Sequence, residues 1–173
     1  MVIVFSGLPG TGKTAIAREL ARKVGAVHVR IDSIEQAIRD SGVARASIDD
    51  AGYRAAYAVA EDNLRLGRVV VADAVNPWPI TRDAWLNVAK RAGAEALEVE
   101  VICSDVQAHR RRVETRTPDI AGLKPPTWDE VLGRDYRPWD RDRLIVDTAR
   151  RSVEENVAII CGAARLTPRA PSG

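Results

Sequence analysis

The sequence has few cysteines, no long apolar run and almost no net charge, and each absence excludes a class of protein. Its two cysteines, Cys103 and Cys161, lie far apart in apolar segments and lack the spacing of a zinc site or a disulfide framework. We therefore expect buried, reduced thiols. No apolar stretch approaches the length of a membrane span, and the apolar run at residues 1–5 is too short for a signal peptide. These absences predict a soluble, cytoplasmic protein with no membrane partner.

The charge is nearly balanced but its basic component is biased. The formal net charge is +2, so no chain-wide field attracts nucleic acid. Nearly all of the 26 basic residues are arginine, a side chain that suits bidentate contacts with phosphate. A GC-rich genome would produce the same bias, so composition alone leaves both explanations open.

Short apolar runs alternate with longer amphipathic stretches, which is the pattern of an α/β fold with a parallel sheet. The apolar runs, each a predicted buried strand, cover residues 2–5, 27–31, 68–72, 97–102 and 144–146. The amphipathic stretches, each a predicted helix, cover residues 13–24, 33–40, 53–66, 81–91, 105–115 and 152–164. We therefore expect a single domain, residues 1–165, with right-handed crossovers.

Two connections contain more chain than a crossover needs. They cover residues 33–66 and 105–142, and we expect them to form the acceptor side of a site and a lid. The tail at residues 166–173 contains proline and serine and is expected to be frayed.

A phosphate-binding loop joins the first predicted strand to the first predicted helix. It matches the pattern GxxxxGK[ST] and consists of Gly7, Leu8, Pro9, Gly10, Thr11, Gly12, Lys13 and Thr14. Its glycines allow positive φ and turn backbone N–H groups toward phosphate oxygens, and the helix N-terminus adds a positive dipole end. In this pattern Lys13 reaches the β- and γ-phosphates of ATP and Thr14 binds Mg²⁺.

The loop establishes nucleotide binding without deciding the reaction, because kinases, GTPases and motor ATPases share it. The third predicted strand ends in Asp73 followed by Ala74, unlike the Asp-Glu ending of many ATPases, and no guanine-specific motif is present. The chain is also short for a motor domain. A phosphotransferase is therefore the leading interpretation, and the sequence does not decide between ATP and GTP.

Two acidic residues follow predicted strands, at the edge of the sheet where α/β proteins bind ligands. Asp32 is the candidate base that accepts the proton of a substrate hydroxyl or orients that hydroxyl. The alternative is an N-cap, because Asp32 with Glu35 also fits a capping box. Asp73 is a candidate for holding Mg²⁺ or contacting substrate, and Asn76 could point its amide into the same cleft. The alternatives for Asp73 and Asn76 are simple turn roles.

The predicted helix at 105–115 is dominated by arginine. Arg112 and Arg116 lie one turn apart on one face, as a lid over the developing charge of phosphoryl transfer would require. Arg110 is a weaker candidate for substrate contact. The alternative is a solvated charged helix. We expect His109, on the same helix, to be exposed.

Further along the chain, aromatic side chains and a last strand end offer weaker signals. Trp128, Tyr136 and Trp139 are expected to pack at the base of the lid, although stacking on a ring is the alternative. Asp147 and Thr148 end the last predicted strand, where a nucleotide base could lie. Their alternative role is to cap the closing helix.

Beyond these patterns, the chain resembles the small P-loop kinases from residue 2 to about residue 164. That group includes chloramphenicol phosphotransferase, zeta toxin kinases, gluconate and adenylylsulfate kinases, and the kinase domain of polynucleotide kinase. The resemblance is closest to the bacterial AAA_33-type ATP-binding proteins. The segments that carry it are Gly7 to Thr14, Arg30-Ile31-Asp32-Ser33-Ile34-Glu35, Val71-Ala72-Asp73 with Asn76-Pro77, His109 to Arg116, Pro126-Thr127-Trp128 and Tyr136-Arg137-Pro138-Trp139.

The resemblance implies a P-loop NTPase three-layer sandwich with a five-stranded parallel sheet of order 2-3-1-4-5 and a helical lid. It implies ATP with Mg²⁺, and Asp32 facing the acceptor hydroxyl. The polynucleotide kinases often have an arginine where this chain has Glu35, which argues against a phosphorylated or polynucleotide acceptor. The strand-Asp-Ser arrangement shared with chloramphenicol phosphotransferase favours a neutral small molecule, such as an antibiotic or a nucleoside.

Three functions remain open from the sequence. The leading one is an ATP-dependent kinase for a hydroxyl of a small molecule. The others are a nucleotide or polynucleotide 5′-hydroxyl kinase, against which the near-neutral charge argues weakly, and an ATP-binding switch or ATPase that phosphorylates no acceptor. No motif in segments 33–66 and 117–142 identifies the acceptor, and none indicates an oligomeric state.

Overall fold

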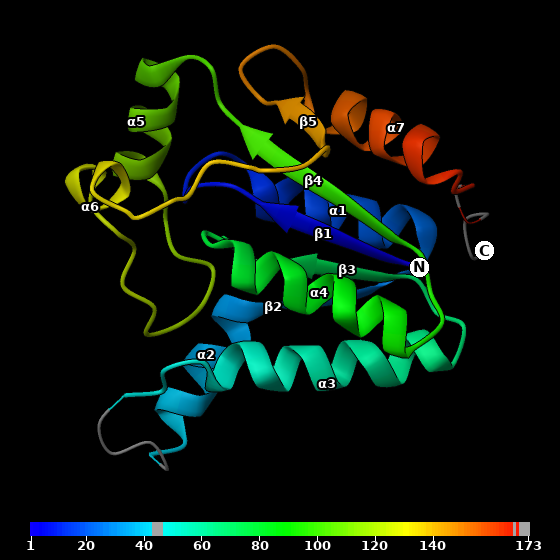
Figure 1. Ribbon diagram of the computed structural model, residues 1–173. Coiled ribbons are helices and arrows are strands. Elements are labelled where there is room, and N and C mark those ends of the chain that lie inside the picture. Colours follow the sequence, from blue (N-terminus) through cyan, green and yellow to red (C-terminus); the bar gives the residue numbers. More distant parts are fainter. Residues whose placement is uncertain (43–46, 168, 170–173) are drawn as a thin grey trace.

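The computed structural model describes residues 1–42, 47–167 and 169 of the chain. Five parallel strands form one sheet in the order β2-β3-β1-β4-β5, with helices on both faces (Figure 1). The strands are β1 (Val2–Ser6), β2 (Val27–Arg30), β3 (Val70–Asp73), β4 (Ala96–Ile102) and β5 (Leu144–Asp147). The helices are α1 (Lys13–Val24), α2 (Ile31–Asp40), α3 (Ala51–Arg65), α4 (Pro79–Arg91), α5 (Val106–Thr115), α6 (Trp128–Leu132) and α7 (Val153–Ala164). The predicted fold class and strand order are confirmed.

The sheet separates two apolar cores, because alternate side chains of each strand point to opposite faces. On one face, Ile3 and Phe5 of β1 pack with α1 and α7. On the other face, Val2 and Val4 pack with α3 and α4, around the fully buried Trp85. Figure 1 shows the same layers, with α3 and α4 on one side of the sheet and α1 and α7 on the other. Every residue of β1 is buried, as expected for the central strand of a parallel sheet.

The register of the strands aligns the residues from which the site is built. Arg30 at the end of β2 pairs with Asp73 at the end of β3, and Asp73 pairs with Phe5 of β1. The loop after β1 therefore starts beside Asp73, at the end of the neighbouring strand β3. The strand on the other side of β3 is β2, which ends at the N-terminus of α2. On the other side of β1, β4 leads into α5, so both long connections approach the carboxyl edge of the sheet.

The short helix α6 is the one element in the described part of the chain that we did not predict. Thr127 caps it, and a reciprocal hydrogen bond from the Thr127 N–H to Glu130 completes a capping box. The helices α5 and α6, with the chain between them, lie beyond the carboxyl ends of the strands in Figure 1. They belong to the segment 105–142 that we expect to act as a lid, and we call this segment the lid.

The tail and the first long segment, residues 33–66, are only partly described. Residues 43–46 of the predicted acceptor segment, and residues 168 and 170–173 of the predicted frayed tail, lie outside the described residues. Within the described tail, Leu166 packs against the α1–α7 core and the Arg169 N–H donates to the Lys23 carbonyl oxygen at 2.8 Å. These two tail residues are therefore held against the domain, which differs from the expectation of a frayed end.

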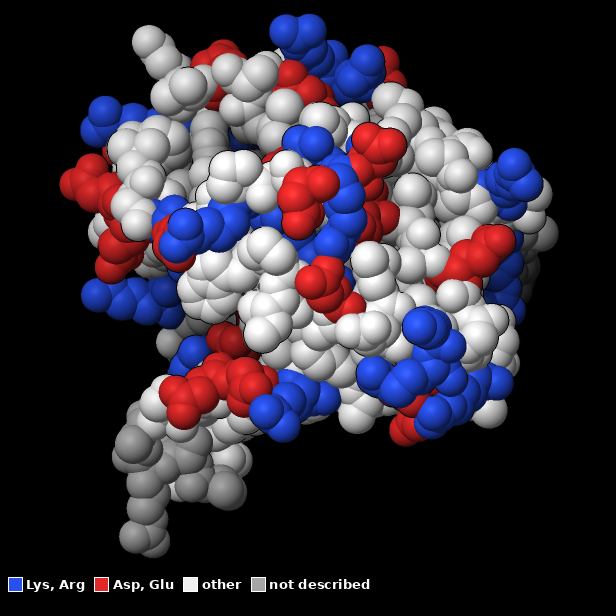
Figure 2. Space-filling view, in the orientation of Figure 1, with Lys and Arg blue, Asp and Glu red and all other residues white. Residues whose placement is uncertain are grey.

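The surface carries its charges mostly in pairs. On the face shown in Figure 2, basic and acidic side chains are interspersed over much of the surface. Arg141, for example, binds Glu98 at 2.6 Å and Asp83 at 2.5 Å. Among the described residues, no helix combines the length and the apolar character needed to cross a membrane.

Candidate active site

A cleft of about 530 Å³ lies at the carboxyl edge of the sheet, between the phosphate loop, α2 and the lid. The loop lines it with Pro9, Gly10, Gly12, Lys13 and Thr14. The other basic lining residues are Arg18, Arg30, Arg39, Arg112, Arg116, Lys124 and Arg134, and the acidic ones are Asp32, Glu35, Asp73 and Asp119. The cleft therefore collects residues from both long connections around the phosphate loop.

The phosphate loop has the backbone shape that its glycines predict. Gly7 and Gly10 have φ values of 134° and 83°, which favour glycine. A Cβ at Gly7 would lie 2.3 Å from the Val101 carbonyl oxygen, and one at Gly10 would lie 2.4 Å from a methyl of Val113. The loop thus packs against β4 on one side and α5 on the other. No side chain caps the N-terminus of α1, which leaves its first N–H groups to bind an anion.

Lys13 is held inside the loop with its ammonium group buried. Its side chain is 7% exposed, and Nζ donates to the Leu8 carbonyl oxygen at 3.0 Å. Burial lowers the pKa of the Lys13 ammonium to about 8, although the nearby carboxylates of Asp73 and Asp32 oppose this shift. A buried cation among backbone N–H groups is a strong attractor for a phosphate anion.

The loop is braced from outside by α5 and by the end of β5. His109 is 7% exposed, its Nε2 donates to the Pro9 carbonyl oxygen at 2.8 Å, and its ring meets Trp128 edge-on at 5.1 Å. The expectation that His109 is exposed was therefore wrong. The Thr148 hydroxyl donates to the Thr11 carbonyl oxygen at 2.7 Å and accepts from Arg112 at 2.7 Å. The contact between the Trp128 and His109 rings is the packing at the base of the lid that we expected for Trp128.

The two strand-end carboxylates both line the cleft. Asp73 is 3% exposed, and its Oδ2 lies 3.2 Å from Nε2 of His28. The Asp32 side chain is 47% exposed and lies 3.8 Å from the Arg30 guanidinium. The helix α2 begins at Ile31 with Arg30 at its N-cap position and no side-chain cap, so the alternative of a capping box with Asp32 was wrong. Asp32 is left in the first helical turn, accessible to a ligand.

Two predicted substrate residues point elsewhere. Asn76 is fully buried at φ 45°, where its amide donates to the Phe5 carbonyl oxygen at 2.8 Å and accepts from the Trp85 indole at 3.1 Å. The amide does not enter the cleft, because both of its ends serve the fold. Arg110 is likewise not among the lining residues; its guanidinium pairs with Glu114 at 2.7 Å.

The end of β5 is also structural. The Asp147 carboxylate accepts from the N–H groups of Ser104 and Ala149, each at 3.0 Å. Ser152 caps α7 through a capping box with Glu155, so the expectation that Asp147 or Thr148 caps that helix was wrong. Neither Asp147 nor Thr148 lines the cleft.

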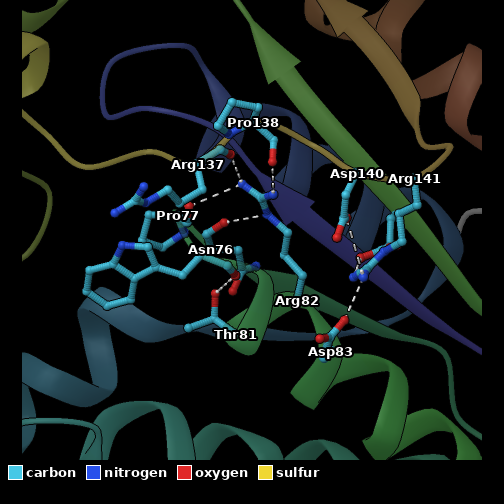
Figure 3. Close-up of polar contacts among 11 residues, drawn as sticks. Asn76, Pro77, Thr81, Arg82, Asp83, Arg137, Pro138, Asp140 and Arg141 are labelled. Atoms are coloured by element: carbon cyan, nitrogen blue, oxygen red, sulfur yellow. Dashed lines mark hydrogen bonds and ion pairs between the residues drawn. The ribbon is translucent and has the colours of Figure 1, made fainter.

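A buried arginine, Arg82 of α4, fastens the chain that returns from the lid. Its guanidinium donates to the carbonyl oxygens of Asn76 and Pro77 on one side and of Arg137 and Pro138 on the other (Figure 3). Its carbon Cζ also lies 4.2 Å from the Trp139 ring centroid and 5.1 Å from that of Tyr136. These contacts fix residues 136–139 against the start of α4. Nothing in the local sequence distinguished Arg82 from a surface arginine.

Several charged cleft residues were not among the predicted site residues, and four of them are Arg30, Asp119, Lys124 and Arg134. Arg30 is 8% exposed and binds both carboxylate oxygens of Asp119, at 2.8 and 3.0 Å. This bidentate pair holds the pKa of the Asp119 carboxyl well below its usual range. Arg134 follows α6, and Lys124 lies in the chain before it. The position of Arg30 at a strand end was a usable signal, whereas the other three lie in irregular chain without a motif.

The residues present fit a magnesium ion bound mainly through a nucleotide. Thr14 and Asp73 line the same cleft and offer a hydroxyl and a carboxylate. Among the described residues, no group of three or more His, Cys, Asp and Glu side chains could hold a metal alone. Mg²⁺ commonly keeps several waters and takes one or two protein ligands plus substrate phosphates, and this donor set matches that mode.

Comparisons with known proteins place the chain in a family and a fold. The model of the AAA_33 family, described as an AAA domain, matches residues 2–123. No protein of curated function matches. The Mycobacterium tuberculosis APS kinase CysC, in complex with AMPPNP and APS, is 20% identical with a TM-score of 0.69, over 95% of this chain and 96% of that one. A gluconokinase from Sinorhizobium meliloti 1021 is 22% identical with a TM-score of 0.61, over 95% and 91% of the two chains. The Deinococcus radiodurans tunicamycin resistance protein is 15% identical with a TM-score of 0.65, over 98% of both.

Proposed function

Because the chain belongs to the AAA_33 family of AAA domains, we propose that it is an ATP-dependent phosphotransferase that phosphorylates a hydroxyl of a small molecule. One observation carries the proposal: a single cleft contains the buried Lys13, the phosphate loop and the carboxylates of Asp32 and Asp73. An anion site beside two acids suits a reaction that binds phosphate and removes a proton. The APS kinase and gluconokinase of the same fold support this class of reaction.

The donor half of the proposed site is the loop with the residues beside it. The N–H groups at the start of α1 and the ammonium of Lys13 would bind the β- and γ-phosphates of ATP. Thr14 would hold Mg²⁺ directly and Asp73 through water, and the ion would neutralise charge between these phosphates. The phosphate oxygens would also accept hydrogen bonds from the Lys13 ammonium, in place of the water that burial excludes.

The acceptor half is centred on Asp32, at the N-terminus of α2. Its carboxylate would orient the acceptor hydroxyl and accept its proton. The acceptor oxygen then forms a bond to the γ-phosphorus while the bond between that phosphorus and the β,γ-bridging oxygen breaks. The products are ADP, the phosphorylated acceptor and the proton held by Asp32.

The side chains of the lid arginines Arg112 and Arg116 have different hydrogen-bond and ion-pair partners. Arg112 donates to the hydroxyl and the carbonyl of Thr148, at 2.7 and 3.0 Å, and so is fixed beside the loop. Arg116 lines the cleft one turn later and is ion-paired with no carboxylate in the described part of the chain. We assign to Arg116 the larger share of stabilising charge that develops on the transferred phosphoryl group.

A transfer assay tests the proposal. Purified protein is incubated with ATP, Mg²⁺ and a panel of hydroxyl compounds, and mass spectrometry detects the mass of an added phosphate. Lys13→Ala should abolish any product, and Asp32→Asn should lower the turnover by about 10²-fold or more, since general-base catalysis contributes about that much. ATP binding without any phosphorylated acceptor, or full turnover by Asp32→Asn, would contradict the proposal.

A further inference from the structure

We propose that the acceptor carries an anionic group, a carboxylate or a phosphate, and that Arg134 and Lys124 bind it across the cleft from Asp32. This inference rests on the proposed kinase function and names the class of its acceptor. It reverses the expectation of a neutral acceptor, which the strand-Asp-Ser arrangement had favoured. The reasons are the charge balance of the cleft, the pairing of its acids and the position of Arg134.

The charge balance of the cleft favours a second anion. Eight basic and four acidic side chains line it. ATP with one bound Mg²⁺ brings about two negative charges, which leaves the filled donor half with an excess of positive charge. In a cleft with low-dielectric walls such an excess favours anionic ligands and raises their local concentration. A neutral acceptor would leave that charge unbalanced.

The acids of the cleft are largely committed to other partners. Asp119 accepts from both Arg30 and Arg18, and Glu35 pairs with Arg39 at 3.2 Å. Arg116, Lys124 and Arg134 form no ion pair within the described ranges, residues 1–42, 47–167 and 169. Lys13 and Arg112 likewise form no ion pair in these ranges, but Lys13 belongs to the phosphate loop and Arg112 is bound to Thr148. Arg116 is assigned to the donor half, so Arg134 and Lys124 remain for the acceptor.

Arg134 lines the cleft together with Lys13 of the loop and with Asp32 and Glu35 of α2. Its positive charge adds to the burial that lowers the pKa of Lys13 and opposes the burial that raises the pKa of Glu35. Glu35 is one helical turn from Asp32 on α2. Arg134 therefore reaches the space between the phosphate loop and the proposed acceptor base.

The backbone around Arg134 is held by hydrogen bonds, whereas its side chain has no hydrogen bond or ion pair with the residues that the structure describes. Its carbonyl oxygen accepts from the Tyr136 N–H at 2.8 Å, and the Arg137 N–H donates to the Pro77 carbonyl oxygen at 2.8 Å. The Arg82 contacts hold the next residues (Figure 3). Because the backbone is held in place, binding an oxyanion costs mainly the rotamer entropy of the Arg134 side chain, which a bidentate contact can offset. Arg134 is exposed and lines the cleft, so its guanidinium is accessible to an anion.

The test measures anion binding with the donor half already filled. Wild-type protein saturated with AMPPNP and Mg²⁺ is titrated by calorimetry with inorganic phosphate and, separately, with malonate. We expect saturable binding of at least one anion, weakened about tenfold or more in Arg134→Ala and further in the double variant with Lys124→Ala. The tighter of the two anions distinguishes a phosphate from a carboxylate. Arg111→Ala, an exposed lid arginine outside the cleft, is the matched control and should bind as the wild type does.

A second arm separates this inference from the proposed function. Lys13→Ala without nucleotide is titrated in the same way, which reports the Arg134 site when the phosphate loop is disabled. Failure of AMPPNP to bind wild-type protein, with anion binding that still depends on Arg134, would refute the kinase and keep the anion site. Absence of binding in both arms, or binding that Arg134→Ala leaves unchanged, would overturn the inference.

Discussion

Replacing Arg82 tests how the lid return is held to the domain. The guanidinium is fully buried and pairs with no carboxylate of the described residues; it contacts four carbonyl oxygens and two aromatic rings. Arg82→Met keeps the apolar stem, removes these contacts and leaves the Asn76 carbonyl oxygen buried without its donor. The change therefore isolates the guanidinium from the packing of α4.

The expected magnitude follows from the geometry. The two shorter bonds, to Asn76 at 3.0 Å and Arg137 at 2.8 Å, involve a charged donor and contribute about 1.5 kcal/mol each. The two longer bonds and the ring contacts roughly offset the cost of burying the charge. We expect a loss of about 3 kcal/mol, which lowers the Tm of a domain of this size by about 6–12 °C.

The assay is reversible urea unfolding, with thermal unfolding as a second measurement. Arg137→Met is the matched control, because the Arg137 side chain is 63% exposed, lies in the same segment and pairs with Asp135 alone among the residues that are described. Surface pairs of this kind contribute at most about 1 kcal/mol. If Arg82→Met loses no more than that control, the guanidinium does not hold the lid return. At a temperature where the variant is folded, its phosphate or malonate binding should also weaken, since Arg134 precedes the fastened residues.

Three further predictions concern the phosphate loop and the lid. Lys13→Met should stabilise the nucleotide-free protein by about 2–3 kcal/mol, because it removes a buried charge that costs about 3 kcal/mol and loses one hydrogen bond, to the Leu8 carbonyl oxygen, that contributes about 1 kcal/mol. Burial lowers the pKa of Lys13 from 10.5 to about 8 in the folded protein, so this gain should be constant below pH 8 and disappear as the pH rises toward 10.5. Urea unfolding at pH 7 and pH 10 measures the gain, and an equal gain at both pH values would contradict the burial argument. Arg116→Ala should lower kcat by about 10²-fold with Tm unchanged, and equal losses for Arg112→Ala and Arg116→Ala would refute the assignment. His109→Ala should weaken AMPPNP binding about tenfold by releasing the Pro9 carbonyl, since removing one partner of a buried hydrogen bond costs about 1–3 kcal/mol; calorimetry with an unchanged Kd would show that the brace is dispensable.

The sheet and the phosphate loop were predictable because their signals are local. An apolar run such as residues 2–5 has to be buried on both faces, and a glycine-rich turn directly after it leaves few alternatives for the backbone. The order of the strands came from the resemblance to P-loop kinases. Element ends shifted by one or two residues, and one such shift mattered: α2 begins at Ile31, which places Asp32 inside the helix instead of at its cap.

Side chains whose partners are distant in sequence were not predictable. The Asn76 amide binds the Phe5 carbonyl oxygen, 71 residues away, and His109 binds the Pro9 carbonyl oxygen, 100 residues away. A turn before proline and a histidine in a charged helix are compatible with exposure or burial alike. Only the packing of β3 beside β1, and of α5 on the loop, decides between the two.

The arginines show the same limit and its functional consequence. Arg82 and Arg134 are both arginines without a distinguishing motif, yet their surroundings differ. The Arg82 guanidinium is buried between two aromatic rings and four carbonyl oxygens, whereas Arg134 lines the cleft. The Arg82 guanidinium stabilises the fold and is not accessible to a ligand. The Arg134 guanidinium can bind a ligand, because no carboxylate in the described chain pairs with it. In the free protein, Arg134 and Lys13 repel each other electrostatically, and an anionic ligand reduces this repulsion. The relief is greatest when donor and acceptor anions occupy the cleft together, so the charge of the cleft favours the complex from which phosphate is transferred.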